Sequence, residues 1–346
     1  MTLDRRMLLG VASVAGIAAV ARTAQAGSLN PPAGPVTPTM KPLDQIEPRT
    51  PVQSLAGDNS NQYVIGQSGS YYLTGNITGL SGLSGIFVSA ANVIIDLNGF
   101  SLFGVAGSAH AIVGGNAADG LSIRNGTISG WGGMGLNLAN TTAQSRIEFL
   151  NVAHCLLGGI SAGQRGFVSS CAVNACGGFG IVTQSSARIV QCIVAATTGT
   201  GNGITCDYGS VIQDCSCTEN GGSGFVTNGL GVLVTGCKAT FNLMDGVLIN
   251  SPVAEIVDTV ATRNTLNGIH STAANGRIDR CSAIQNFQNG IQVDTVSGST
   301  AILRCTSSNN FGTDYSIAAG NRPAQVASWG SVAGGFGATD AVANIR

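Results

Sequence analysis

The chain has 346 residues and a formal net charge of −1, so no basic surface marks it as a nucleic-acid-binding protein. Its 50 glycines and its low content of charged residues (10%) exclude a disordered chain and favour short stacked strands joined by turns. We therefore expect a folded protein with no nucleic-acid partner.

Residues 1–26 predict an export signal. Arg5 and Arg6 precede an apolar, Ala-rich run, and residues 24–26 (Ala-Gln-Ala) form a small-x-small cleavage pattern. The paired arginines resemble a twin-arginine signal, although Asp4 stands where such signals usually have Ser or Thr, and an ordinary secretory signal is the alternative. Because the apolar run is shorter than the ~20 residues of a spanning helix, we expect an exported, periplasmic or extracellular protein with no membrane span after signal removal.

Residues 27–55 contain most of the 9 prolines of the chain. Proline excludes central strands and helix interiors. This segment is therefore predicted to be a linker or an extended arm, and residues 56–346 are predicted to form the folded domain.

An internal repeat dominates the region from residue 203 to residue 310, where three marks return every 21 to 24 residues. A Gly before a large apolar residue recurs at Gly203, Gly224, Gly246, Gly268 and Gly290. A small residue predicted to point inward recurs at Cys215, Cys237, Thr259, Cys281 and Cys305. An Asn recurs at Asn220, Asn242, Asn264, Asn286 and Asn310. Such a period is typical of a solenoid.

Each repeat is too short for a helix between its strands, so the pattern predicts an all-β, right-handed parallel β-helix of about ten coils with N- and C-terminal caps. We expect the Gly of each coil to stand where a Cβ would crowd the backbone. We expect the Asn to adopt a left-handed conformation and to bond the Asn of the next coil in a ladder. Residues 63–77 and 321–346 are the expected caps.

The 10 cysteines lie mostly in phase with the repeat, which indicates a buried column rather than a disulfide framework. Cys155 and Cys176 instead occupy the Asn position of two neighbouring coils. Neighbouring strands lie ~4.8 Å apart, a distance that a disulfide accepts. A disulfide between these two cysteines is therefore kept as an alternative.

The repeat from Gly268 to Asn286 resembles the right-handed parallel β-helix proteins of the pectate-lyase-like superfamily. More narrowly, residues 47–346 resemble a group of secreted bacterial β-helix proteins without an assigned activity. The segments that carry this resemblance are 47–51 (Glu-Pro-Arg-Thr-Pro), 69–73 (Gly-Ser-Tyr-Tyr-Leu), 93–100 (Val-Ile-Ile-Asp-Leu-Asn-Gly-Phe), 123–126 (Ile-Arg-Asn-Gly) and 338–340 (Ala-Thr-Asp). The resemblance implies an extracytoplasmic protein. It transfers no catalytic residue, because the chain contains neither the Asp-Pro-His-Glu run nor the Asp-Asp pair that enzymes of this superfamily carry in their active sites.

Residues that project outward from the strands are the candidates for chemistry. His270 and Asp294 are expected on neighbouring coils, diagonally placed, and form the candidate acid/base pair; a plain surface contact is the alternative. Arg280 is expected to pair with Asp258, and an anion site at Arg280 and Arg304 is a further alternative.

Aromatic and metal-binding residues give little signal. Trp131, Trp329, Tyr208 and Tyr315 are scattered, which argues against a strong glycan-binding groove. The three histidines lie in different coils and no Cys-x-x-Cys occurs, so no metal site is expected, and no cofactor either.

We therefore expect an exported protein that presents a rigid, noncatalytic surface to a polysaccharide or a protein. One alternative is a polysaccharide lyase, epimerase or hydrolase with an unfamiliar site, and another is a structural cell-surface element. The oligomeric state is left open.

Overall fold

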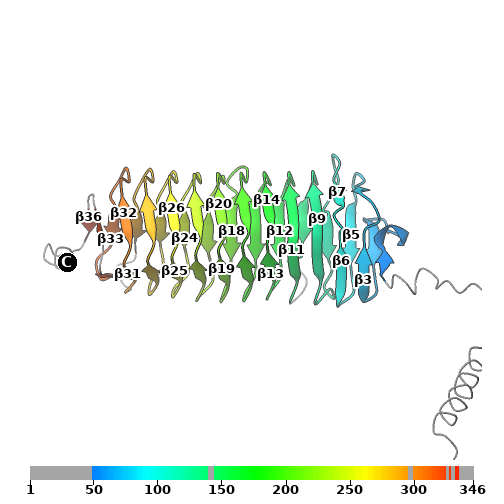
Figure 1. Cartoon of the computed structure of the whole chain (residues 1–346), viewed down its shortest axis with the longest axis horizontal. Helices are drawn as coiled ribbons and strands as arrows, with labels where there is room; N and C mark the ends of the chain where they lie inside the picture. The colour runs from blue at the N-terminus through cyan, green and yellow to red at the C-terminus, as the bar shows by residue number, and fades with distance from the viewer. Residues whose placement is uncertain (1–48, 139–143, 295–298, 325–326, 329–331, 335–346) are drawn as a thin grey trace, which may run out of the picture. The chain divides into compact units, whose positions relative to one another are not determined.

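The computed structural model describes residues 49–138, 144–294, 299–324, 327–328 and 332–334. The expected export signal and residues 27–48 of the expected arm lie outside this part of the chain. The described part is a parallel β-solenoid of about 11 coils, as predicted, in which strands far apart in sequence lie side by side along one axis (Figure 1).

Within the described residues, one sheet has 13 strands and carries the large apolar residue of each Gly anchor. Its strands are β2 (Asn61–Ile65), β5 (Ser84–Val88), β8 (Ile112–Gly114), β10 (Met134–Asn137), β12 (Gly158–Ala162), β15 (Phe179–Thr183), β18 (Asn202–Cys206), β21 (Phe225–Thr227), β24 (Val247–Ile249), β27 (Ile269–Ser271), β30 (Ile291–Val293), β33 (Tyr315–Ile317) and β36 (Val332–Gly334). We call it the anchor sheet.

The second sheet has 23 strands in the described part of the chain, because most coils contribute two short strands to it. The strands are β1 (Thr50–Pro51), β3 (Gly69–Tyr72), β4 (Ile77–Thr78), β6 (Val93–Asp96), β7 (Ser101–Phe103), β9 (Ser122–Ser129), β11 (Arg146–Ala153), β13 (Phe167–Ser169), β14 (Ala172–Asn174), β16 (Arg188–Val190), β17 (Ile193–Ala195), β19 (Val211–Gln213), β20 (Ser216–Thr218), β22 (Leu233–Thr235), β23 (Lys238–Thr240), β25 (Glu255–Val257), β26 (Val260–Thr262), β28 (Arg277–Asp279), β29 (Ser282–Ile284), β31 (Ala301–Leu303), β32 (Thr306–Ser308), β34 (Arg322–Ala324) and β35 (Ala327–Ser328).

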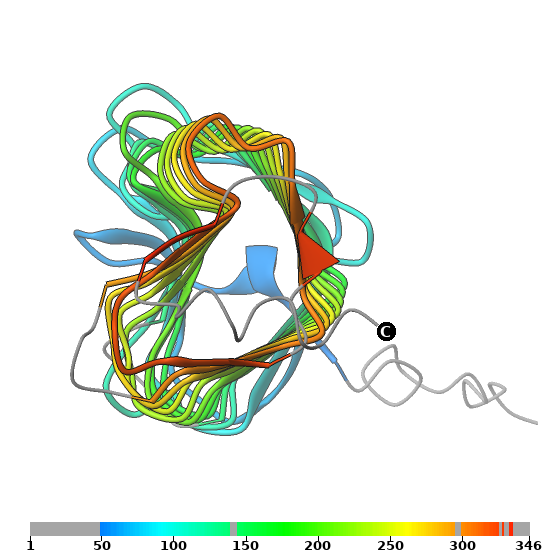
Figure 2. The same ribbon diagram turned by 90° about the vertical axis from the view of Figure 1, so that its left-hand side faces the viewer.

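The core consists of columns of side chains that repeat from coil to coil. Seen end-on, the coils superimpose (Figure 2), so equivalent residues stack in register. In the anchor sheet the stacked, fully buried residues include Phe225, Val247, Ile269 and Ile291. Alternate side chains of a strand share one face, and this leaves the residues between them directed outward.

The glycine of each anchor is required for space, as predicted. A Cβ on Gly268 would lie 2.7 Å from the carbonyl oxygen of Gly290 and 2.8 Å from the Cβ of Ala283. Both distances are shorter than packed atoms accept, so the next coil could not approach as closely with any larger residue.

The cysteine column is confirmed: all ten cysteines are buried free thiols. Cys171, Cys192, Cys215, Cys237, Cys281 and Cys305 are at most 2% exposed, and Thr259 continues their column at 0%. Cys155 and Cys176, the pair left open above, are likewise free and fully buried. The cysteines act as small core residues.

The asparagine ladder is confirmed, but the expected backbone conformation was assigned to the wrong residue. Asn242 donates from Nδ2 to Oδ1 of Asn264 at 2.9 Å, and Asn264 donates in the same way to Asn286 at 3.0 Å. The left-handed residue is the one before each Asn, such as Phe241 (φ 57°) and Arg263 (φ 56°). That residue turns the chain outward, while the Asn must point inward to reach its neighbours.

The N-terminal end of the solenoid is closed by a short segment. The 3-10 helix η1 (Val52–Ser54) places Val52 in the core at 0% exposure, and Figure 2 shows this blue segment lying across the interior. The compact unit begins at Arg49, so residues 49–55 of the expected arm belong to this end instead. Within the described residues we find no helix that is apolar and long enough to traverse a lipid bilayer.

Candidate functional site

The predicted pair lies on the outward face of the anchor sheet. His270 is the middle residue of β27, where Ile269 and Ser271 are buried on either side and the imidazole is directed outward. In register, it stands between Leu248 of β24 and Gln292 of β30. The side chain is 17% exposed, so one edge of the ring faces solvent and the rest is packed.

Asp294 contacts His270 as the spacing predicted. Its Oδ2 lies 2.8 Å from Nε2 of His270, and its Oδ1 accepts a hydrogen bond from Nε2 of Gln292 at 2.7 Å. The side chain of Asp294 is 47% exposed. The exposed edge of the imidazole is therefore its Nε2 side, shared with a solvent-accessible carboxylate.

Asp245 is the residue that our sequence reasoning missed. Its Oδ2 lies 3.3 Å from Nδ1 of His270, and the residue is only 4% exposed. Its Oδ1 accepts hydrogen bonds from the backbone N and from Nδ2 of Asn267, at 3.0 and 2.8 Å. A buried carboxylate thus holds one ring nitrogen of His270 while an exposed one contacts the other.

A second polar ladder explains the position of Asp245. It runs through the residue before each anchor glycine, and Oδ1 of Asn267 accepts in turn from Nδ2 of Asn289 at 3.1 Å. Asp245 is the one charged residue among Asn202, Ser223, Asp245, Asn267 and Asn289, which share this position. A carboxylate in a row of neutral polar residues was the available signal in the sequence.

The two carboxylates alter the protonation of the imidazole. Burial opposes the charged ring, but the hydrogen bonds and attraction of Asp245 and Asp294 outweigh it and raise the pKa of His270 above 6.5. Burial raises the pKa of Asp294, but the hydrogen bonds from His270 and Gln292 lower it. The net result is a pKa below the usual 3.8. The raised pKa favours the cationic imidazole, a state in which Nε2 can donate a proton.

Further polar side chains continue along the same outward face. Asn250 donates from Nδ2 to Oδ1 of Asn228 at 3.3 Å, and Thr272 donates from Oγ1 to Oδ1 of Asn250 at 3.1 Å. All three residues are exposed. Val226, the middle residue of β21, is 4% exposed and adds no polar group.

The anion site considered at Arg280 and Arg304 is filled by the protein itself. Asp279, at 0% exposure, accepts hydrogen bonds from Arg304 at 2.9 Å and from Arg277 at 2.6 Å. Arg280 binds Asp279 and, as predicted, Asp258, with Nε 2.6 Å from Oδ1 of Asp258. The bonds from Arg304 hold the pKa of Asp279 below 3.8 against the effect of burial.

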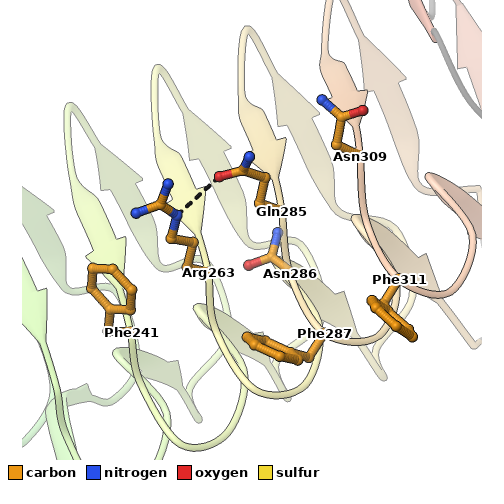
Figure 3. A pocket seen from close by; sticks show the side chains of 7 residues that line it. All are labelled: Phe241, Arg263, Gln285, Asn286, Phe287, Asn309 and Phe311. Atoms are coloured by element: carbon orange, nitrogen blue, oxygen red, sulfur yellow. Dashed lines mark hydrogen bonds between the residues drawn. The ribbon is translucent and has the colours of Figure 1, made fainter.

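A groove at the corner of the solenoid was not predicted. It has a volume of about 400 Å³ and is lined by Phe241, Arg263, Gln285, Asn286, Phe287, Asn309 and Phe311 (Figure 3). We call it the corner groove. Of the aromatic residues named from the sequence, Trp131 and Tyr315 are buried in the core, and Trp329 lies outside the described residues. The sequence signal for this groove was a phenylalanine directly before or after a ladder asparagine, as at Phe241, Phe287 and Phe311.

Among the described residues, no group of three or more His, Cys, Asp or Glu side chains is arranged to hold a metal ion. Asp245, His270 and Asp294 form a hydrogen-bonded row with the imidazole in the middle, so the two carboxylates face opposite nitrogens of one ring. This arrangement suits proton transfer rather than metal coordination.

No protein-family model and no curated protein sequence matches the chain. Several solved structures share its architecture, and two of them are epimerases. A mutant of the periplasmic alginate epimerase AlgG is 13% identical, with a TM-score of 0.63 over 77% of this chain and 76% of that one. The A-module of the mannuronan C-5 epimerase AlgE6 from Azotobacter vinelandii is 14% identical, with a TM-score of 0.61 over 79% of this chain and 87% of that one. At such low identity the likeness shows the fold alone: this is a parallel β-helix protein with the architecture of the alginate epimerases.

Proposed function

We propose that this is an exported protein that binds a polysaccharide along the outward face of its anchor sheet. The observation that carries the proposal is the row of exposed polar side chains on consecutive coils, from Asn228 through Asn250 and Thr272 to Asp294. Coils repeat every ~4.8 Å, so the row offers hydrogen-bonding groups at regular intervals on a rigid support. A linear polymer that carries many hydroxyl groups is the ligand that fits such a row.

The structural neighbours support a carbohydrate ligand, because both are named as epimerases of alginate or mannuronan. Export is supported by the N-terminal residues, with Arg5 and Arg6 before an apolar run and a cleavage pattern that ends at Ala26. A periplasmic neighbour agrees with this location. N-terminal sequencing of the protein recovered from the periplasm tests export directly, with Gly27 expected as the first residue.

Catalysis on the bound polysaccharide is the second candidate, and a specific observation favours it. His270 has a buried carboxylate on Nδ1 and an exposed one near Nε2. The buried Asp245 orients the ring, and Nε2 can then exchange a proton with a substrate bound beside Asp294. General acid or base chemistry by His270, assisted by Asp294, is the activity that this geometry supports.

One experiment addresses binding and catalysis together. The protein is incubated with a panel of acidic and neutral polysaccharides, and binding, unsaturated products and new reducing ends are followed. Binding that weakens at least tenfold in Asn250→Ala supports the anchor-sheet face. Products that disappear in His270→Ala and Asp294→Ala support catalysis, whereas products that persist in both variants place the chemistry elsewhere. A panel that gives neither binding nor products favours the alternative of a structural cell-surface element.

A further inference from the structure

The corner groove is built from two positions that recur in each coil. The left-handed residue before the ladder Asn supplies Phe241, Arg263, Gln285 and Asn309. The residue after the ladder Asn supplies Phe287 and Phe311, which are 61% and 88% exposed. Figure 3 shows the first set in one row along the coils and these two rings beside it. At ~4.8 Å per coil, the groove runs parallel to the axis of the solenoid.

Arg263 is the charged residue of the groove, and the described residues give it no carboxylate partner. Its Nε donates to Oε1 of Gln285 at 2.9 Å, and its guanidinium lies 5.5 Å from the ring centre of Phe241. Arg277, Arg280 and Arg304, by contrast, all contact Asp279. The bond to Gln285 and the ring of Phe241 fix the orientation of Arg263 and leave its two Nη groups free to bind an anion.

We propose that the corner groove binds an acidic sugar unit of a glycan chain, with the sugar ring against Phe287 or Phe311 and its anionic group on Arg263. A fixed guanidinium recognises a carboxylate or a sulfate through paired hydrogen bonds. Aromatic rings bind the apolar face of a sugar ring, and the amides of Gln285 and Asn309 bind hydroxyl groups at its rim. This inference rests on the proposed binding of a polysaccharide and adds a second site and a class of sugar.

The dimensions of the groove favour a sugar over a protein partner. Its volume of about 400 Å³ falls in the ~300–1,000 Å³ range of sites for small ligands. A stable protein interface buries about 800 Å² on each partner, which requires a wider apolar surface than these three rings. The cation in this otherwise neutral groove favours a ligand that carries negative charge.

The turn 285–290 connects the corner groove to the anchor-sheet face. Phe287 lines the groove, and two residues later Asn289 donates from Nδ2 to Gln292, which bonds Asp294. The Cα atoms of Phe287 and Asn289 are at most about 7 Å apart, because an extended chain spans ~3.3–3.6 Å per residue. The turn therefore places the corner groove beside the start of the anchor strand β30.

The test measures, by calorimetry on the full chain, the affinity for three oligosaccharides of equal length: a hexuronate, a sulfated sugar and a neutral sugar. The corner-groove variants are Arg263→Gln, Phe287→Ala and Phe311→Ala. Glutamine already occupies the equivalent left-handed position at Gln285 (φ 56°), so Arg263→Gln is expected to fold. The matched control is Arg188→Gln, because Arg188 is also exposed and also bonds a glutamine, Gln213, at 3.0 Å. Thermal melting of each variant checks folding.

We expect the wild-type protein to bind an acidic oligosaccharide more tightly than the neutral one. Arg263→Gln is expected to weaken the affinity for the acidic ligand about tenfold and to leave the affinity for the neutral ligand unchanged. Phe287→Ala and Phe311→Ala are expected to lower the affinity for both kinds of ligand. Arg188→Gln is expected to change neither affinity. The hexuronate and sulfated ligands distinguish the two kinds of anion. Equal affinity for acidic and neutral ligands, or unchanged binding in folded Arg263→Gln and Phe287→Ala, overturns the inference.

The two proposals fail in different ways. If Asn250→Ala abolishes binding and the corner-groove variants do not, the anchor-sheet proposal stands and the corner-groove inference is wrong. If the corner-groove variants abolish binding and Asn250→Ala does not, the reverse holds. Binding of a protein but of no oligosaccharide overturns both.

Discussion

Asp245 and His270 lie on neighbouring coils of the anchor sheet, with Oδ2 of the buried carboxylate 3.3 Å from Nδ1 of the imidazole. The other carboxylate oxygen belongs to the polar ladder, where it accepts two hydrogen bonds from Asn267. The carboxylate cannot rotate away from the ring without breaking those bonds. The orientation of the His270 ring is therefore set by the buried polar ladder, through Asp245, rather than by contacts with exposed side chains.

Asp245→Asn is expected to lower the pKa of His270. The amide keeps the ladder acceptor but removes the negative charge beside Nδ1, which is among the causes that raise this pKa. Titration of the imidazole by NMR measures the change, and Asp294→Asn is expected to act in the same direction. An unchanged pKa of His270 in both variants contradicts the electrostatic role given to these carboxylates.

The stability contributed by His270 is expected to depend on pH. Its pKa is raised in the folded state, so the folded protein binds a proton more tightly than the unfolded chain. This contribution is fully present below about pH 6.5, the unperturbed value, and is lost as the pH rises through the raised pKa. The difference in free energy of unfolding between wild type and His270→Gln should therefore shrink from pH 6 to pH 9. A difference that grows over this range refutes the assignment.

Asn264→Ala is expected to destabilise the solenoid by about 3 kcal/mol or more, because several buried polar groups lose their partners together. The lost bonds run from the backbone N and Nδ2 of Asn242 to Asn264, and from Nδ2 of Asn264 to Asn286 and to the oxygen of Ala239. Denaturant unfolding followed by circular dichroism measures the loss. The control is Thr265→Ala at the exposed next residue, expected within about 0.5 kcal/mol of wild type.

Gly268→Ala is expected to destabilise the fold by about 1–3 kcal/mol, the usual range for an overpacked core. The added Cβ would meet Nδ2 of Asn286 at 2.6 Å and the carbonyl oxygen of Gly290 at 2.7 Å. Gly75, with nothing within 4 Å of its Cβ position, provides the matched substitution Gly75→Ala. Thermal unfolding of both variants separates crowding from a general effect of replacing glycine, and equal losses would argue against crowding.

The buried cysteines predict a simple result with a thiol reagent. All ten thiols are buried in the folded protein, so an aromatic disulfide reagent should react slowly in buffer and with ten thiols after denaturation. Rapid reaction of several thiols with the folded protein would show that the column opens readily. Fewer than ten thiols after denaturation without a reductant would reveal a disulfide, for which Cys155 and Cys176, whose side chains hydrogen-bond each other, are one candidate pair.

The candidate site was predictable only in part. Alternation along β27 and β30 placed His270 and Asp294 on one outward face, and their contact follows from the repeat alone. Asp245 comes from the turn before β24, where side-chain direction depends on the shape of the turn rather than on strand alternation. The corner groove was missed for the same reason: Phe241 and Phe287 lie in the turns around the ladder, on either side of an inward residue.

The repeat by itself determined the parallel β-helix, the asparagine ladder and the cysteine column, because a fixed period stacks equivalent residues on one another whatever the details of the turns. Tertiary structure alone decided which residue of each corner is left-handed, and that choice directs Phe241 and Arg263 outward into a groove. It also decided that Asp279 satisfies the arginines which the sequence left available for an anion. The physical reason is that turn side chains take their direction from local backbone angles and from the neighbouring coils, neither of which a one-dimensional period specifies.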